Sequence, residues 1–412
     1  MKQLDTIPAE TVELAATEDP LRAFIAPARQ RRGRILFIVE SGTDVRLVEG
    51  LQEISDLRIV ARKIEQGREI SRVPSVPVEV AVGPSSRVRF AELVFRMLVN
   101  DRHDYDGCLV QGYGMAAVAA NAAAKITGKP TLMIVCSAIE EYYRCRLQAK
   151  DEGRCYRRAE DYALRMLARL NARAGGSYIV LSQHLESVVR SHGSRSDVRI
   201  IPLYGVDTTI FQPTESSREL LRGRLGLPTN GSLILSSSRV APEKDTRALL
   251  RAMHLLREKG RNVWLLCLTG KHQEFLALAR KAGIADRVIA VEAVHPTAEL
   301  PAYYQAADVC VQASRAEGLG FSPLEALACG TPVVATAVGG LRETIIDGAT
   351  GWTHQPGNAQ DLAIKIAEAL DDPEEAKRRA LNGRSMVCRE YERKKVFREL
   401  AEYLESALGA GS

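Results

Sequence analysis

From Arg34 onward, short apolar runs alternate with helical stretches, and this alternation constrains the fold more than any other feature of the sequence. The runs are apolar at nearly every position, which is typical of parallel strands covered by helices on both faces. Seven runs precede residue 202: RILFIV (34–39), LRIVAR (57–62), VEVAV (78–82), GCLVQ (107–111), TLMIVC (131–136), SYIVLS (177–182) and VRII (198–201). Five follow it: LILSSS (233–238), VWLLCLT (263–269), RVIAVEA (287–293), VCVQAS (309–314) and PVVATAV (332–338).

A Pro-bounded segment without periodicity, 201–213, interrupts this pattern and is interpreted as a linker. The sequence therefore predicts an α/β protein with two facing Rossmann-like domains, each a doubly wound parallel sheet, and a cleft between them. The expected parts are a tail (1–30), an N-terminal domain (31–205), a C-terminal domain (206–387) and a last segment (388–412), helical over 388–408 and packed back on the N-terminal domain. Such a cleft suits a reaction that joins two separate substrates, because ligands bind beyond the carboxyl ends of the strands.

Composition agrees with a folded protein of two or three domains, since 46% of the 412 residues are hydrophobic and 26% are charged. No apolar stretch approaches the ~18 residues that cross a bilayer, and the first residues lack the apolar core of a secretory signal. The eight cysteines form no CxxC pair and are interpreted as reduced thiols. We therefore expect a cytoplasmic protein, with a peripheral position at the inner membrane leaflet as a further option.

The net charge of +5 is too small to indicate nucleic-acid binding. Its distribution is uneven, because Arg144–Arg173 holds nine basic and four acidic residues and so carries +5 by itself. Such a segment attracts phosphate groups of an acceptor or an anionic membrane surface. A solvated helix face explains the same charges equally well.

The densest functional signal is VQASRAEGLGFSPLEALACGTPVVATAVGG, residues 311–340. A strand, a glycine-bearing loop and a helix follow one another there. The tetrapeptide 322–325, Ser-Pro-Leu-Glu, predicts a capping box with Ser322 as the helix N-cap. The backbone N–H groups of Leu319, Gly320 and Phe321 are then expected to face an anion, for which phosphate is the natural candidate.

Glu317 and Glu325 lie eight positions apart on either side of this loop. Carboxylates beside a phosphate site are useful if they accept hydrogen bonds from sugar or ribose hydroxyl groups. For Glu325 a purely structural role in the capping box is an alternative.

Arg239 and Lys244 occupy the loop after the first strand of the second unit. Two cations at this place could hold a diphosphate leaving group. By itself the pattern is weak, because loop cations are usually solvated, but it shares a sheet edge with Glu317.

Together these residues resemble the retaining GT-B-fold glycosyltransferases of the large family-four group, the glycosyl transferases group 1. Glu317 and Glu325 match the E-x7-E signature of that family, and Arg239 and Lys244 match its diphosphate-binding pair. The segments IPLYGVDTTIFQP (201–213) and DGATGWTHQPGN (347–358) support the likeness. It covers 175–385 well and 30–175 more loosely.

The resemblance implies three catalytic residues, Glu317, Arg239 and Lys244. Glu317 would bind hydroxyl groups of the donor sugar, and Glu325 would bind the ribose of the nucleotide. The two cations would hold the diphosphate, and Gly318, Leu319, Gly320 and Phe321 would offer backbone amides. Further donor-binding residues are Gly42 and Thr43, although the usual double glycine is absent and a plain turn explains this loop as well.

The acceptor side departs from the family pattern, because many relatives carry a histidine where this chain has Cys136 and Ser137. Transfer remains possible, since in such enzymes the leaving phosphate takes the acceptor proton. We place Cys136, Ser137, Glu140 and Gly112 on the acceptor side, with a structural helix surface as an equal alternative for Glu140.

Three other patterns are weaker. The segment GYGMAA (112–117) matches a dinucleotide-binding fingerprint, but no acidic residue ends the next strand. The DYD triplet (104–106) imitates a metal-binding D-x-D motif but precedes a strand, so a turn is the better interpretation. The seven histidines show no ligand spacing, and we therefore predict neither metal nor cofactor.

The sequence thus predicts a metal-independent enzyme that moves a sugar from a nucleotide-sugar, preferably a UDP-sugar, to a polysaccharide, lipid-linked or small-molecule acceptor. The anomeric configuration would be retained, and the nucleotide-sugar would be a co-substrate. Two alternatives stay open: a nucleotide-sugar-binding protein of the same fold without transferase activity, and a nicotinamide-dependent oxidoreductase.

Overall fold

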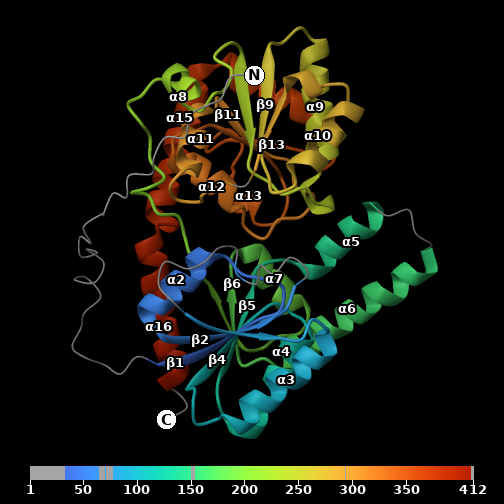
Figure 1. Ribbon diagram of the computed structural model, residues 1–412, viewed down its shortest axis with the longest axis vertical. Helices are drawn as coiled ribbons and strands as arrows, with labels where there is room; N and C mark the ends of the chain where they lie inside the picture. Colours follow the sequence, from blue (N-terminus) through green and yellow to red (C-terminus); the bar gives the residue numbers. More distant parts are fainter. Residues whose placement is uncertain (1–32, 65–69, 71–77, 150–153, 293, 410–412) are drawn as a thin grey trace, which may run out of the picture. The chain divides into compact units, whose positions relative to one another are not determined.

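The computed structural model describes residues 33–64, 70, 78–149, 154–292 and 294–409. Within these residues the strands form two parallel sheets, which Figure 1 shows with helices on both faces. The predicted tail (1–30) lies outside the described residues. The fold class is confirmed, since both sheets are parallel and their strand runs match the predicted ones to within two residues at most ends.

The first sheet has seven parallel strands in the order β3-β2-β1-β4-β5-β6-β7. Its central strands are apolar on both faces, and β1 is buried from Ile35 to Val39. The strands are β1 (Arg34–Val39), β2 (Asp56–Arg62), β3 (Glu79–Gly83), β4 (Gly107–Gln111), β5 (Thr131–Val135), β6 (Ser177–Val180) and β7 (Asp197–Ile200).

Helices α3, α4 and α6 pack side by side along this sheet (Figure 1). Asn171 of α6 fixes the contact with α4, because its amide donates to the carbonyl oxygen of Tyr113 (3.0 Å) and its Oδ1 accepts from Asn121 (3.2 Å). The helices of this domain are α2 (Val45–Ile54), α3 (Arg87–Asn100), α4 (Met115–Thr127), α5 (Ile139–Ala149), α6 (Arg154–Ala174) and α7 (Gln183–Ser191).

The second sheet has six parallel strands in the order β10-β9-β8-β11-β12-β13, which is the Rossmann order 3-2-1-4-5-6. Five strands lie at or near the positions that the apolar runs predict: β8 (Ser232–Ser236), β9 (Val263–Leu268), β10 (Val288–Val291), β11 (Val309–Gln312) and β12 (Val333–Thr336). The remaining strand is β13 (Trp352–His354). The last strand was not predicted, because three residues are too short for a recognisable run.

Helices α9 and α14 pack against one another on this sheet, and α8, α11, α12 and α15 form a second group that contacts the first where α15 meets α14. Figure 1 shows α9 and α10 apart from α11, α12 and α15. The elements are α8 (Arg218–Arg224), η1 (Pro242–Lys244), α9 (Thr246–Glu258), α10 (His272–Lys281), η2 (Ala285–Arg287), α11 (Leu300–Ala306), α12 (Phe321–Ala328), α13 (Leu341–Thr344) and α14 (Ala359–Asp371).

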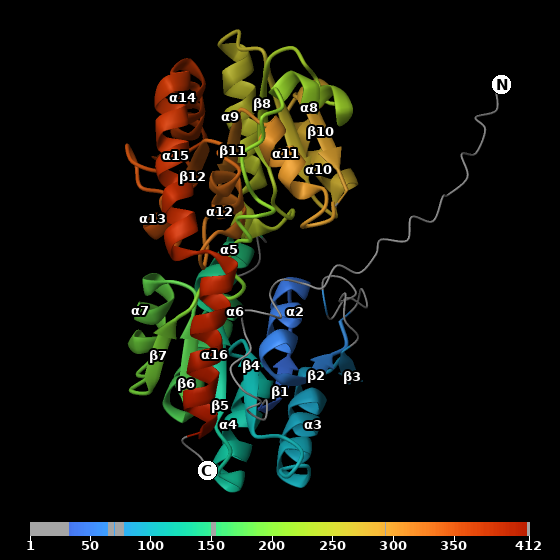
Figure 2. The same ribbon diagram turned by 90° about the vertical axis from the view of Figure 1, so that its left-hand side faces the viewer.

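The last two described helices are α15 (Pro373–Glu390) and α16 (Arg393–Gly409), so the helical segment predicted over 388–408 is interrupted at residues 391–392. The break coincides with the linker, where the N–H of Val206 donates to the carbonyl of Tyr391 (2.7 Å) and Arg393 donates to that of Val206 (3.0 Å). Beyond the break, α16 lies against α2 of the seven-stranded sheet (Figure 2). The domain limits at 205 and 387 stay predictions.

Glycine allows the close approach of α16 to α2. A Cβ atom on Gly50 of α2 would lie 1.8 Å from the ring of Phe397, so no other residue fits there without movement. In the part of the chain that the structure describes, no helix combines the length and apolarity needed to span a bilayer.

Candidate active site

The residues with predicted catalytic roles lie at the topological switch point of the six-stranded sheet. β8 and β11 are neighbours there, and the chain continues from them toward opposite edges of the sheet. The loop after β8 carries Arg239 and Lys244, and the loop after β11 carries Glu317. Both loops meet at the carboxyl edge of the sheet, which is where ligands bind in this fold.

Lys244 and Glu317 form an ion pair, with 2.5 Å between Nζ and Oε2. The same carboxylate oxygen accepts hydrogen bonds from the Gln312 amide and the Ser314 hydroxyl, both at 3.0 Å. Burial opposes ionisation of Glu317, but Lys244 and these hydrogen bonds outweigh it and lower its pKa. The structure therefore holds a fixed carboxylate beside a fixed cation.

Arg239 does not join this pair. Its guanidinium forms an ion pair with Glu243, whose side chain is fully buried. The Arg239 side chain is 58% exposed, and Arg146 of α5 approaches the other oxygen of Glu243 at 3.8 Å. The two predicted diphosphate-binding cations therefore pair with different carboxylates, Arg239 with Glu243 and Lys244 with Glu317.

Glu325 is the fifth residue of α12 and is buried. Its Oε1 is 2.6 Å from the Arg46 guanidinium, and its Oε2 accepts a hydrogen bond from the hydroxyl of Tyr304 (2.9 Å). Burial raises the pKa of Glu325, although Arg46 opposes that rise. Both oxygens of the Glu325 carboxylate are thus bound by side chains outside α12, and this carboxylate does not cap its own helix.

The predicted capping box is wrong. α12 begins at Phe321, and its N-cap is Gly320 with φ 94°, a conformation that glycine adopts readily. Ser322 lies inside the helix, and its hydroxyl donates to the carbonyl oxygen of Ser237 (3.0 Å). The loop after β11 is thereby tied to the loop after β8.

The glycine loop is close-packed on both sides. A Cβ on Gly318 would lie 2.1 Å from the carbonyl oxygen of Cys136, and the carbonyl of Gly318 accepts a hydrogen bond from Ser182 (2.7 Å). Gly339 and Gly340 support the loop from the other side, since the N–H of Gly340 donates to the Glu317 carbonyl (3.2 Å). Both glycines lie within the 311–340 segment, but no role was predicted for them.

Phe321 and the buried Leu319 complete the loop. The Phe321 ring stacks on Tyr204 of the linker, with 4.2 Å between ring centroids. The Arg46 guanidinium also lies over the Tyr204 ring, 4.3 Å from its centroid. The loop of the C-terminal domain therefore contacts the linker and α2.

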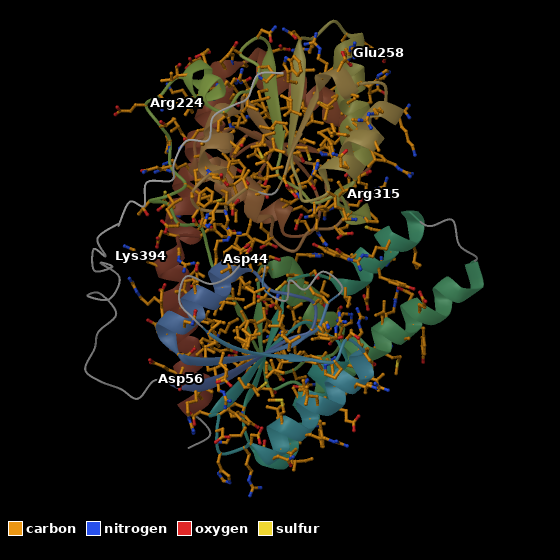
Figure 3. All side chains as sticks on the ribbon, in the orientation of Figure 1. Asp44, Asp56, Arg224, Glu258, Arg315 and Lys394 are labelled. Atoms are coloured by element: carbon orange, nitrogen blue, oxygen red, sulfur yellow. The ribbon has the colours of Figure 1, made fainter. Side chains whose placement is uncertain are left out.

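The first loop of the seven-stranded sheet leads to Arg46. Gly42 has φ 88°, and Thr43 is buried with a hydroxyl that lacks a hydrogen-bond partner among the described residues. Asp44 caps α2, and its carboxylate accepts from Arg46 Nε and Nη2, both at 3.0 Å. Figure 3 shows Asp44 at the edge of this sheet. Arg46 itself was not predicted, because a single helix-surface arginine carries no recognisable pattern.

The predicted acceptor-side residues divide into two groups. Gly112 has φ 105°, and the Gln111 amide beside it lies 3.7 Å from the sulfur of Cys136. Burial raises the pKa of Cys136 to about 12, which keeps the thiol neutral at physiological pH. Ser137 is half-buried at the end of β5. Cys136 borders the glycine loop, because its carbonyl oxygen faces Gly318.

Glu140 turns instead toward α7, where its Oε1 is 3.0 Å from Nε2 of His192. Glu141 pairs with His184 of the same helix at 3.3 Å. This hydrogen bond and the charge of Glu141 raise the pKa of His184 against the effect of burial. The two histidines, which showed no ligand spacing in the sequence, thus fasten α7 to α5.

The basic segment Arg144–Arg173 is not one surface, because it divides between α5 and α6. Arg144 and Arg146 lie on α5, which packs beside η1 and the candidate site. Arg165, Arg169 and Arg173 lie on the exposed side of α6, away from that site. The side chains of Lys150, Arg154, Arg157 and Arg158 lie outside the described residues.

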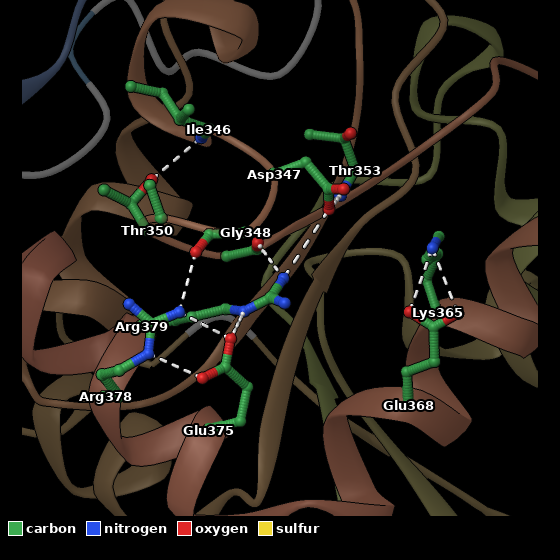
Figure 4. Close-up of polar contacts among 12 residues, drawn as sticks. Ile346, Asp347, Gly348, Thr350, Thr353, Lys365, Glu368, Glu375, Arg378 and Arg379 are labelled. Atoms are coloured by element: carbon green, nitrogen blue, oxygen red, sulfur yellow. Dashed lines mark hydrogen bonds and ion pairs between the residues drawn. The ribbon is translucent and has the colours of Figure 1, made fainter.

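The segment 347–358, which supported the family resemblance, has a structural explanation (Figure 4). Asp347 accepts from the N–H of Thr353 (3.1 Å), and Arg379 of α15 donates to the carbonyl of Gly351 (2.9 Å). Arg378 donates to the carbonyl of Gly348 (2.8 Å). These contacts hold the turn before β13 against α15.

Two pockets are lined by residues that the structure describes. A pocket of about 230 Å³ lies between the domains and is lined by Arg46, Tyr204, Thr297 and Arg393, among others. Another hollow lies at the amino ends of β1 to β3, opposite the ligand-binding edge of a parallel sheet. The DYD triplet is at that opposite edge, where Asp106 accepts hydrogen bonds from Arg34, so its structural interpretation holds.

No group of three His, Cys, Asp or Glu side chains among the described residues is arranged to hold a metal ion. The expected absence of a metal stays a prediction.

Residues 217–386 match the family model of glycosyl transferases group 1. The chain is 41% identical over 180 residues to a D-inositol 3-phosphate glycosyltransferase of Xylanimonas cellulosilytica, covering 41% of this chain and 42% of the relative. It is 33% identical over 209 residues to a GDP-mannose-dependent alpha-(1-6)-phosphatidylinositol monomannoside mannosyltransferase of Mycolicibacterium smegmatis, covering 48% and 54% of the two chains. The chain thus spans about half the length of the curated relatives it matches.

The crystal structure of HepE from Anabaena in complex with UDP and glucose superposes with a TM-score of 0.70. The sequences are 20% identical, and the match covers 91% of this chain and 100% of the other. This likeness shows the fold, which is the GT-B arrangement of two Rossmann-like domains. Residues 217–386 of this chain are therefore similar to the glycosyl transferases group 1 family, and the chain as a whole has the GT-B fold.

Proposed function

We propose that this chain is a glycosyltransferase that moves a sugar from a nucleotide-sugar to an acceptor with retention of the anomeric configuration. The observation that carries the proposal is the Lys244–Glu317 ion pair at the switch point of the C-terminal sheet. A carboxylate can accept hydrogen bonds from sugar hydroxyl groups, and a cation beside it can meet the charge of a leaving diphosphate. Both groups are already fixed where a ligand of this fold would bind.

In the proposed reaction the bond between the anomeric carbon and the diphosphate oxygen breaks, and a bond from that carbon to the acceptor oxygen forms on the same face. The acceptor proton passes to the departing diphosphate. Lys244 would stabilise the growing negative charge on that group, and Arg239 would assist after leaving Glu243. In this proposal the two side-chain cations stabilise the leaving diphosphate, so the reaction requires no metal ion.

The donor's ribose is assigned to Glu325, whose carboxylate is held by Arg46 and Tyr304. Gly318, Leu319, Gly320 and Phe321 would supply backbone amides to the sugar and phosphate. A UDP-sugar remains the preferred donor. The GDP-mannose dependence of the Mycolicibacterium smegmatis relative makes a GDP-sugar the alternative.

For the acceptor, the name of the inositol phosphate relative favours a small phosphorylated polyol over a polysaccharide. A lipid-linked acceptor is the remaining alternative. Arg146 supports the first choice, since this α5 cation lies 3.8 Å from Glu243 beside the site. The cytoplasm stays the proposed compartment. This proposal rests on cysteine usage, since the seven cysteines whose side chains the structure describes are all unpaired.

The test is an assay for released nucleoside diphosphate, with UDP- and GDP-sugars and a panel of acceptors. We expect release that depends on both donor and acceptor, and its loss in Glu317→Gln. Glu258→Gln, a change in an exposed pair with His254, is the matched control.

The absence of a histidine at Cys136 favours a second candidate, a nucleotide-sugar-binding protein without transfer. Donor binding, measured as a rise in melting temperature, together with no release across the panel would support that candidate and overturn the proposed activity.

A further inference from the structure

α6 exposes large apolar side chains to solvent at regular intervals. Tyr162, Met166 and Leu170 are 64%, 37% and 54% exposed. They lie four residues apart, so they follow one another along one face of the helix. Single exposed apolar residues are common, but a row of three on one helix face indicates a contact partner.

Arginines accompany this row. Arg165, Arg169 and Arg173 are exposed and also recur every four residues, directly beside the apolar positions. Arg165 pairs with Asp161 (2.9 Å), and the other two add positive charge to the same side. We call this surface the α6 face; it consists of Tyr162, Arg165, Met166, Arg169, Leu170 and Arg173.

The opposite side of the helix is fixed in the protein. Ala168 and Ala172 are buried, and Asn171 is hydrogen-bonded to the carbonyl oxygen of Tyr113 and to Asn121 of α4. The helix therefore cannot rotate to bury its apolar row without breaking these contacts. Figure 1 shows the N-terminal part of α6 extending beyond the strands of the seven-stranded sheet. The exposed fractions of Tyr162, Met166 and Leu170 show that the α6 face is accessible to solvent.

We infer that the α6 face binds an anionic lipid surface. Apolar side chains beside arginines are typical of helices that lie in the membrane interface, where the apolar groups enter the acyl boundary and the cations meet lipid phosphates. A second copy of the chain is a poorer partner, because a symmetric contact would bring the three arginines against their own counterparts.

The partner assignment is independent of the proposed transferase activity, since it uses no residue of the candidate site. Of the two partners considered for the basic segment Arg144–Arg173, an acceptor phosphate and an anionic membrane, we select the membrane, and only for the part of the segment on α6. The arginines of α5 remain beside the candidate site.

The experiment is co-sedimentation of the full chain with phosphatidylcholine vesicles that contain either no anionic lipid or about 30% phosphatidylglycerol. Each surface cation gains ~1 kcal/mol near an anionic membrane, so three give a preference of about 100-fold at low salt. We expect the triple variant Arg165→Gln, Arg169→Gln, Arg173→Gln to lose at least tenfold of that binding.

A second triple variant, Tyr162→Ser, Met166→Ser, Leu170→Ser, should also lose about tenfold or more, because each apolar group contributes its own burial energy. Two matched controls should bind like the natural chain: Ile364→Ser with Leu381→Ser, which are exposed apolar residues, and Arg247→Gln with Arg251→Gln on α9. Retained thermal stability shows that the variants fold.

Binding that ignores the phosphatidylglycerol content, or that both α6 variants retain, would overturn the inference. So would a concentration-dependent dimer, seen by light scattering, that the serine variant abolishes while vesicle binding is unchanged. That result would identify a second copy of the chain as the partner.

Discussion

Lys244 and Glu317 neutralise one another, so the proposed donor diphosphate would have to share the Lys244 ammonium group with a carboxylate. A diphosphate that approaches Lys244 competes with the Glu317 carboxylate for the same ammonium group. Glu317 would keep its hydrogen bonds from Gln312 and Ser314 during that exchange, so its carboxyl group would stay in place for a sugar hydroxyl. The pair can therefore open toward a ligand without leaving a buried carboxylate unsatisfied.

Lys244→Ala tests the proposed role of this cation. We expect kcat/KM to fall about 30-fold or more, equal to ~2 kcal/mol of transition-state stabilisation, because the ammonium meets charge that grows as the diphosphate leaves. The measurement is the steady-state rate of nucleoside diphosphate release. Lys271→Ala, in an exposed pair with Glu274, is the control. A loss confined to acceptor affinity would contradict the role.

Arg46→Gln tests whether Arg46 keeps Glu325 ionised. Burial already raises the pKa of Glu325, and Arg46 is the cation that opposes the rise. Without it the pKa rises further, so the carboxyl holds its proton to higher pH and accepts fewer hydrogen bonds from the ribose. We expect donor affinity to fall about tenfold near pH 6 and to recover toward pH 8, as the proton is lost.

The measurement is calorimetric titration with the donor nucleotide at both pH values. Arg58→Gln, which removes an exposed pair with Glu79, provides the matched control. An equal loss of affinity at both pH values would show that Arg46 acts through packing alone. The sequence could not predict Arg46, since its carboxylate partner lies 279 positions away and no spacing connects them.

At the scale of elements, the sequence predicted the strands well because buried parallel strands must be apolar on both faces. The loops were less predictable, since their contacts come from distant segments. Ser322 could not cap α12, because Gly320 already turns the chain in the left-handed region and the carbonyl of Ser237 takes the serine hydroxyl. Arg239 and Lys244 lie in one loop. Glu243, which lies between them in the sequence, forms an ion pair with Arg239 and not with Lys244.

Gly318→Ala is the prediction at this scale. The new Cβ would lie 2.1 Å from the carbonyl oxygen of Cys136, which belongs to the backbone and cannot turn away. We expect the free energy of unfolding to fall by about 1–3 kcal/mol, the usual cost of overpacking, and turnover to fall with it. Chemical denaturation measures the first effect.

Gly270→Ala is the control, because a Cβ there meets no atom within 4 Å. If both substitutions leave stability unchanged, the contact between the loop after β11 and the end of β5 is looser than described. Donor turnover would then have to be explained without this contact.

At the scale of the whole described fold, the two sheets are joined by few polar contacts besides the linker and α16. One of them is Glu343 of α13, whose two carboxylate oxygens accept from the backbone N–H groups of Gln183 (2.9 Å) and His184 (2.8 Å). These are the first residues of α7, where the helix leaves unpaired N–H groups and a partial positive charge. The carboxylate of one domain thus completes a helix of the other.

Glu343→Ala should therefore lower the free energy of unfolding by about 1–2 kcal/mol, because two N–H groups lose a charged acceptor. The turn before α13 also supports Glu317, since the N–H of Gly340 donates to the Glu317 carbonyl, so the KM for the donor should rise as well. Denaturation and steady-state kinetics measure the two effects. Glu258→Ala, which removes only an exposed pair with His254, should change neither. If Glu343→Ala behaves like Glu258→Ala, the α13–α7 contact does not hold the domains together in solution.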